Sequence, residues 1–151
     1  MKIYAFIFAR GGSKGVPDKN IKKMCGKPLI AYSIEIAQNI DVIEKIFVST
    51  EDENISRIAS AYGVDIIQRP KSLAQDDSSE WLAWQHAINW LEKRDDSFDV
   101  FLSLPTTSPL RKKKDVASCL DALDNESDVV IGITKANRSP WFNMVKQDKN
   151  K

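Results

Sequence analysis

The chain has 151 residues, of which 42% are hydrophobic and 28% charged, a composition typical of one folded domain rather than a disordered protein. Its formal net charge is only +1, so charge favours neither a nucleic acid nor a membrane as partner. The apolar N-terminus is too short to span a bilayer and lacks a small-residue cleavage site, and Cys25 and Cys119 lack metal-type spacing, so we expect a cytoplasmic protein with free thiols.

Apolar runs alternate with amphipathic stretches along the chain. The runs are rich in Ile, Val and Phe and predict strands that are buried on both faces. They cover residues 3–9, 45–50, 64–68, 99–104 and 128–134. Strand–helix alternation of this kind predicts a mainly parallel sheet covered by helices on both faces, the three-layer α/β architecture. We expect a single α/β domain over residues 1–151.

The expected helices have recognisable ends. Pro28 suits the first turn of a helix that follows the first strand. Thr50 and Glu53 fit a capping box before a second helix, and Gly63 fits the left-handed position after it. A helix in the 80s and another near residues 116–123 complete the pattern.

The helix in the 80s has an apolar stripe at helical spacing. The stripe consists of Trp84, Ile88 and Leu91. His86 falls opposite it, so we interpret His86 as a solvated helix residue and not as a catalytic base. Asp76 and Asp77 are expected to cap this helix, although acid groups near a ligand are the alternative. Cys119 lies on an apolar helical face and is expected in the core.

The segment from Arg10 to Asn20, at the end of the first strand, concentrates glycine and positive charge. Its glycines can bring backbone N–H groups close to an anion, and phosphate is the ligand that uses such groups together with cations and a hydroxyl. The residues concerned are Gly11, Gly12, Gly15, Arg10, Lys14, Lys19 and Ser13. The spacing is neither GxxxxGK[ST] nor GxGxxG, which excludes a P-loop and disfavours a dinucleotide site. A solvated surface turn is the alternative.

ARGGSKGVPDKN, followed by GKPLIAYSI, resembles the N-terminal signature of the acylneuraminate cytidylyltransferase family. The likeness continues through VSTEDENI, VDIIQRP with LAQDDSS behind it, and LPTTSPLR, in the family's order and over almost the whole chain. The resemblance implies a Rossmann-like fold of the nucleotide-diphospho-sugar transferase type. It also implies that CTP and a sialic or related nonulosonic acid react to give the CMP-sugar and pyrophosphate. A Kdo-activating nucleotidyltransferase is an alternative that fits QRP and LPTTSPLR less well.

The resemblance carries roles to individual residues. It implies that Arg10, Ser13 and Lys19 hold the triphosphate, that Asn20 contacts the nucleotide and that Arg69 reads the cytosine. The candidate catalytic residues are Arg10 and Lys19, and the candidate CTP ligands are Gly11, Gly12, Ser13, Lys14, Asn20 and Arg69. The physical chemistry agrees, because guanidinium groups fork onto phosphate oxygens or a base carbonyl.

LPTTSPLR (104–111) matches the family's loop at the acceptor end. It contributes the candidate substrate-binding residues Thr106, Thr107, Ser108 and Arg111. Hydroxyls and an arginine can hold a polyhydroxylated sugar acid, with Arg111 on its carboxylate; a proline-bounded turn with Ser and Thr caps is the alternative. The family's usual glutamine falls on Pro105, which has no side-chain donor.

The resemblance implies Mg²⁺ as cofactor, which helps such a transfer. The family's metal ligands are aspartates beyond the corresponding point of this chain, so we expect a domain truncated at its C-terminus, without metal ligands and with an unpaired strand at 141–146. Such a chain should bind CTP but turn over poorly. An active enzyme and a non-catalytic nucleotide-binding remnant therefore both stay open. The expected partners are CTP and the sugar acid, with a homodimer in the full-length form.

Overall fold

The structure, a computed structural model, describes residues 1–133. The chain divides into two compact units, Met1–Lys113 and Lys114–Lys151. The elements of the first unit are β1 (Ile3–Phe8), β2 (Lys23–Met24), β3 (Lys27–Pro28), α1 (Leu29–Gln38), β4 (Ile43–Thr50), α2 (Glu53–Ala61), β5 (Asp65–Gln68), the 3-10 turn η1 (Lys71–Leu73), α3 (Glu80–Glu92) and β6 (Val100–Ser103). Helix α4 (Lys113–Asp121) follows.

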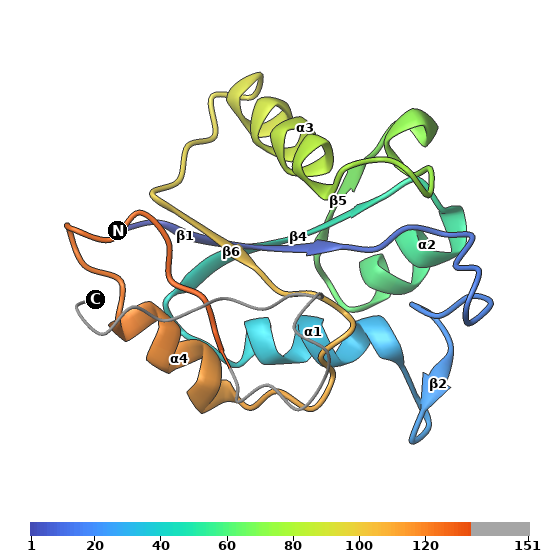
Figure 1. The fold of residues 1–151 in the computed structure, drawn as a ribbon, viewed down its shortest axis with the longest axis horizontal. Helices are drawn as coiled ribbons and strands as arrows, with labels where there is room; N and C mark the ends of the chain where they lie inside the picture. Colours follow the sequence, from blue (N-terminus) through green and yellow to red (C-terminus); the bar gives the residue numbers. More distant parts are fainter. Residues whose placement is uncertain (134–151) are drawn as a thin grey trace. The chain divides into compact units, whose positions relative to one another are not determined.

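Four parallel strands form the sheet of the first unit, in the order β5-β4-β1-β6. Figure 1 shows α3 on one side of this sheet and α1 and α2 on the other. The predicted mainly parallel sheet with helices on both faces is therefore confirmed, and four of the five predicted strands form. β2 and β3 make a separate antiparallel ladder. The sequence did not predict this ladder, because strands of two residues are too short to show a hydrophobic pattern.

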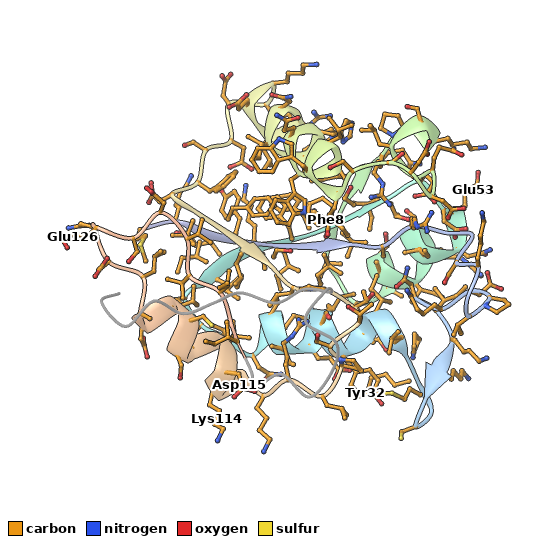
Figure 2. The ribbon with its side chains drawn as sticks, in the orientation of Figure 1. Phe8, Tyr32, Glu53, Lys114, Asp115 and Glu126 are labelled. Atoms are coloured by element: carbon orange, nitrogen blue, oxygen red, sulfur yellow. The ribbon has the colours of Figure 1, made fainter. Side chains whose placement is uncertain are left out.

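An aromatic core fills the space between the sheet and α3. Tyr4, Phe6 and Phe8 alternate along β1, so their side chains share one face. The ring of Phe6 lies 5.5 Å from that of Phe47 on β4 and 4.3 Å from that of Phe101 on β6. Phe8 extends the cluster toward the carboxyl end of the sheet (Figure 2). The core of the first unit thus depends on aromatic stacking across three strands.

The buried stripe of α3 differs from the predicted one. Its buried residues are Ala83, Ala87 and Leu91, whereas Trp84 lies at the flank, 6.3 Å from the ring of Phe8. Large rings already occupy the sheet face, so the helix packs closely through alanine and places its tryptophans around the contact.

Two predicted caps are also wrong. The N-cap of α2 is Asp52, whose Oδ1 accepts from the N–H of Ile55 at 2.9 Å. Thr50 is still part of β4 and its Oγ1 accepts from the N–H of Asp52 at 3.1 Å. At α3 the cap is Ser79 and not Asp76 or Asp77. The left-handed conformation expected after α2 is present at Gly63, with φ +75°.

The predicted strand at 128–134 does not form over its described residues 128–133. The side chains of Val129, Ile131 and Ile133 are exposed there. An extended segment becomes a strand only when a neighbour pairs with its backbone, and the described residues provide none for it. The expected strand at 141–146 lies outside the described residues. In α4 the buried residue is Val116, and Cys119 is half-buried rather than in the core.

Within residues 1–133, no helix is both long and apolar enough to cross a membrane.

We predict that Asp96, which contacts the first strand at its amino end, makes the free energy of unfolding depend on pH. Hydrogen bonds from Lys45 and Tyr4, at 2.6 Å each, lower the pKa of Asp96 below its ordinary value of 3.8. A carboxyl whose pKa is lower in the folded chain contributes stability above its ordinary pKa, and this contribution is lost as the pH falls through the folded value. Asp96→Asn should therefore lower the free energy of unfolding at pH 7, by an amount that shrinks below about pH 4.

Urea unfolding of both proteins between pH 7 and pH 3 measures this difference. Asp95→Asn is the matched control, because the neighbouring Asp95 is exposed. Equal pH dependence of wild type and Asp96→Asn would show that the contacts of Asp96 contribute nothing to acid stability.

Candidate functional site

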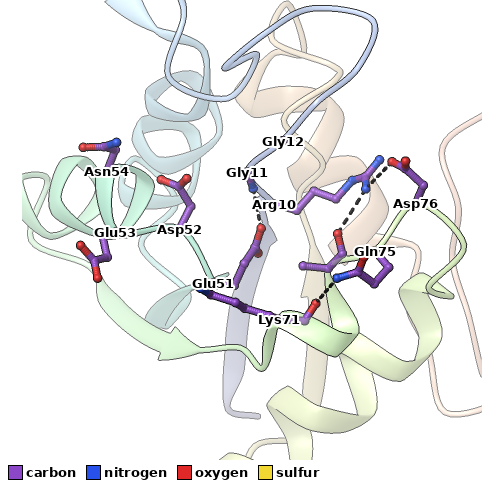
Figure 3. A pocket seen from close by; sticks show the side chains of 11 residues that line it. Arg10, Gly11, Gly12, Glu51, Asp52, Glu53, Asn54, Lys71, Gln75 and Asp76 are labelled. Carbon is purple, nitrogen blue, oxygen red and sulfur yellow. Dashed lines mark hydrogen bonds and ion pairs between the residues drawn. The ribbon is translucent and has the colours of Figure 1, made fainter.

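A pocket of about 570 Å³ opens where three parallel strands end. Its wall consists of the segments that follow β1, β4 and β5, shown in Figure 3. The lining residues are Arg10, Gly11, Gly12, Glu51, Asp52, Glu53, Asn54, Lys71, Ala74, Gln75 and Asp76. In α/β sheets ligands bind at this carboxyl edge, and the volume lies within the roughly 300–1,000 Å³ of small-molecule sites. The pocket is therefore the candidate functional site.

Two glycines let the first loop pass close to the end of β4. A Cβ on Gly11 would lie 2.7 Å from Oδ2 of Asp52, so any other residue would push against the cap of α2. Gly12 has φ +61°, a conformation that costs other residues energy. The N–H of Gly11 donates to Oε1 of Glu51 at 2.7 Å. The loop is thus fastened to β4 and is not a freely solvated turn.

Two cations of this loop converge on one carboxylate. Arg10 donates to the carbonyl of Ala74 at 3.2 Å and forms an ion pair with Oδ1 of Asp76 at 2.8 Å, as Figure 3 shows. Lys14 pairs with the other oxygen of Asp76. Hydrogen bonds from Lys14 and Arg10 lower the pKa of Asp76, so this side chain is an ionised counter-ion at neutral pH. Asp76 therefore pairs with the cations of the glycine loop and does not cap α3, contrary to the prediction.

Glu51 joins the first loop to the end of β5. Its Oε1 accepts from Gly11, and its Oε2 forms an ion pair with Arg69 at 3.0 Å. Arg69 is buried and lies behind Glu51 rather than in the pocket wall. Glu51 is not among the site residues predicted from the sequence. The available signal was its place, directly after a buried strand at the edge where ligands bind.

A second hydrogen-bonded group connects the loops that follow β1 and β6. Nδ2 of Asn20 donates to the carbonyl of Arg10 at 2.8 Å, and Oγ1 of Thr106 donates to Oδ1 of Asn20 at 2.7 Å. Both side chains are buried. Ser33 on α1 donates to the carbonyl of Pro105 at 3.2 Å, and the guanidinium of Arg111 donates to the same carbonyl. Burial lowers the pKa of Arg111.

The structure brings together only some of the predicted site residues. Those that line the pocket are Arg10, Gly11 and Gly12, and Lys14 reaches its edge through Asp76. Those that do not line it are Ser13, Lys19, Asn20, Arg69, Thr106, Thr107, Ser108 and Arg111. Thr107 and Ser108 are exposed on the loop after β6.

The environment of His86 also differs from the prediction. The residue is half-buried, and its Nδ1 has no accessible surface. Burial lowers its pKa first of all, and the charges of Arg69 and Lys93 lower it further. The lowered pKa favours the neutral imidazole, and the half-buried His86 is not the solvated helix residue that was predicted.

Acidic side chains outnumber basic ones in the pocket wall. Arg10 and Lys71 face four acids, namely Glu51, Asp52, Glu53 and Asp76. Three of these acids already accept hydrogen bonds from Gly11, Ile55 and Arg10. Within residues 1–133, no group of three or more His, Cys, Asp or Glu side chains is arranged to hold a metal ion. Three of the four described carboxylates of the wall thus already take part in contacts within the protein.

Comparison with known proteins gives a consistent set of relatives. The chain is 34% identical over 153 residues to post-translational flagellin modification protein B of Campylobacter coli, covering 99% of this chain and 65% of that protein. It is 38% identical over 137 residues to a pseudaminic acid cytidylyltransferase of Campylobacter jejuni, covering 89% and 59%. It is 32% identical over 152 residues to CMP-N,N'-diacetyllegionaminic acid synthase of Legionella pneumophila, covering 99% and 66%. The chain thus spans less than two thirds of the length of these relatives.

A solved structure gives the same fold. The structure of CMP:2-keto-3-deoxy-manno-octonic acid synthetase complexed with CTP superposes with a TM-score of 0.66 at 24% identity, over 80% of this chain and 46% of that one. At this identity the likeness bears on the fold alone. The cytidylyltransferase family itself matches residues 4–147, a range that includes the sheet except for Ile3, the glycine loop and the loop after β6. The chain therefore belongs to the cytidylyltransferase family.

Proposed function

We propose that this chain binds CTP in the pocket and forms the nucleotide-binding part of an enzyme that transfers CMP to a sialic-type nonulosonic acid, with release of pyrophosphate. The observation that carries the proposal is the convergence of Arg10 and Lys14 on Asp76 beside the glycine loop. Two cations held at one point are arranged for an anion with several oxygens. A triphosphate satisfies this arrangement better than a single carboxylate does.

The geometry of the loop supports a phosphate ligand in this place. Gly12 lines the pocket in a left-handed conformation, so its backbone can approach a ligand without a side chain in the way. Lys71 adds a third cation from η1. Because carboxylates outnumber these cations in the wall, the ligand must displace or neutralise some of the negative charge as it binds.

The acceptor is proposed from the relatives and from the loop after β6. The relatives' names specify pseudaminic, N-acylneuraminic and N,N'-diacetyllegionaminic acids, which are nonulosonic acids. The loop contains the exposed hydroxyls of Thr107 and Ser108 and the guanidinium of Arg111. Nη1 of Arg111 makes no hydrogen bond within the described part of the chain. We assign the sugar hydroxyls to the threonine and serine, and the carboxylate to Arg111.

In the proposed reaction the sugar acid's hydroxyl oxygen bonds to the α-phosphorus of CTP, the bond from that phosphorus to the pyrophosphate oxygen breaks, and the hydroxyl proton leaves to solvent. Catalysis of such a step consists mainly of positioning and charge neutralisation. Arg10 and Lys14 supply both to the leaving phosphates, and Lys19 belongs to the same loop. Mg²⁺ stays a proposed cofactor, and no step is assigned to it.

We predict that Arg10→Ala weakens CTP binding about 10- to 100-fold, the effect of losing one charge-assisted hydrogen bond. Isothermal titration of CTP against the purified chain measures the dissociation constant. Arg57→Ala is the matched control, because Arg57 is an exposed arginine on α2 outside the pocket. Thermal melting shows that both variants are folded. If the two variants bind CTP equally well, the loop after β1 is not the phosphate site.

We predict that Asp76→Asn has the opposite effect and tightens CTP binding about two- to tenfold at low ionic strength, because the ligand no longer competes with two exposed ion pairs. The gain should shrink as salt screens the charges. Asp77→Asn removes the same charge one residue away and serves as control. Titrations at about 20 and 300 mM salt, where the Debye length is on the order of 20 Å and 6 Å, measure the difference. Weaker binding by Asp76→Asn would show that Asp76 organises the site instead of competing for it.

A further inference from the structure

Buried polar atoms without partners lie between the sheet and α3, close to the pocket but outside its wall. They include Nε of Arg69, Nδ1 of His86 and Oγ of Ser49, none of which makes a hydrogen bond within the described residues. Arg69 is 6% exposed and Ser49 1% exposed. Buried polar groups in native proteins nearly always have partners, so this cluster calls for an explanation.

The strand register places Arg69 on the same side as His86. Ile67 pairs with Ser49 in the parallel ladder, and the N–H of Arg69 continues that ladder by donating to the carbonyl of Thr50 at 2.9 Å. Alternation along the strand therefore puts Arg69 on the face of Ile67. That face packs against Ala87 of α3, the residue next to His86. The guanidinium and the imidazole thus share one layer.

The two groups have complementary hydrogen-bonding capacity. Nε of Arg69 can only donate, whereas a neutral imidazole has one nitrogen that accepts. Burial, followed by the charges of Arg69 and Lys93, lowers the pKa of His86 and favours its neutral form. Nη2 of Arg69 already donates to Oε2 of Glu51 at 3.0 Å. A second contact at Nε would leave the guanidinium no freedom to rotate.

We propose that His86 is a positioning residue for Arg69. Its Nδ1 accepts the Nε–H of Arg69, directly or through one water molecule, and holds the guanidinium between Glu51 and α3, the position from which Arg69 is proposed to read the base of the nucleotide. Selectivity for cytosine then depends on a side chain of α3 that does not touch the ligand. The part concerning the base rests on the proposed function, whereas the pairing of His86 with Arg69 does not.

The first test uses the chain without a ligand. The imidazole resonances can be assigned without ambiguity, because His86 is the single histidine of the chain. Nitrogen-15 NMR of the imidazole should show the proton on Nε2 and an accepting Nδ1 at pH 7.5. Arg69→Lys keeps the positive charge but removes the Nε–H, so it should shift the Nδ1 resonance toward that of a free imidazole. A proton on Nδ1, or a resonance that Arg69→Lys leaves unchanged, would overturn the proposal.

The second test measures the ratio of dissociation constants for UTP and CTP. His86→Leu removes the acceptor and should lower this ratio about tenfold, the effect of one buried hydrogen bond. His86→Asn keeps an acceptor near the position of Nδ1 and should retain the ratio within about twofold. Gln85→Leu, on the exposed side of the same helix, controls for the added apolar side chain, and thermal melting confirms folding.

The outcomes separate the two proposals. A wild-type ratio in folded His86→Leu, together with a lowered ratio in Arg69→Lys, would overturn the role of His86 and leave CTP binding in place. Equal loss in His86→Leu and His86→Asn would also overturn it, because shape and not the acceptor would then matter. Failure of the wild type to bind CTP would overturn the proposed function, and the NMR result would still decide the pairing.

Discussion

The arrangement of the site depends on one carboxylate. Glu51 follows β4 and is contacted by the backbone of Gly11 after β1 and by the guanidinium of Arg69 after β5. It therefore connects the carboxyl ends of three neighbouring strands. A buried ion pair with a backbone hydrogen bond on its second oxygen is well satisfied, whereas removal of either partner would leave a buried charge. The course of the glycine loop and the position of Arg69 both follow from this contact.

The acids of the pocket have different functions, and burial decides which. The side chain of Glu51 is 13% exposed, whereas that of Asp76 is 41% exposed. Solvent screens the exposed ion pairs of Asp76, so they break at little cost, whereas Glu51 remains in place. The carboxylate that pairs with Arg10 and Lys14 is thus the easily displaced one. The less exposed Glu51 holds the glycine loop in position.

The sequence predicted the central strands and the glycine loop because their signals are local. Runs such as IYAFIF favour burial on both faces. Glycine at position 12 permits the positive φ of the loop, whatever the rest of the chain does. The missing strand at 128–133 has the same apolar character, but pairing depends on a neighbour that its own residues cannot specify.

The buried stripe of α3 was predicted wrongly, because a helical projection favours large residues whereas a sheet face covered by aromatic rings packs best against the small Ala83 and Ala87. The role of Glu51 and the burial of His86 could not be predicted, because both depend on contacts with segments that are distant in the sequence.

The strand order places the loop after β1 between the pocket and the loop after β6. The chain places β4 and β5 on one side of β1 and then returns to place β6 on the other. The loop after β1 therefore borders both the pocket and the loop after β6. Asn20 fixes this border, since one end of its amide holds the carbonyl of Arg10 and the other end holds Thr106. A buried pair of hydrogen bonds thus joins the glycine loop to the segment that contains Thr107, Ser108 and Arg111.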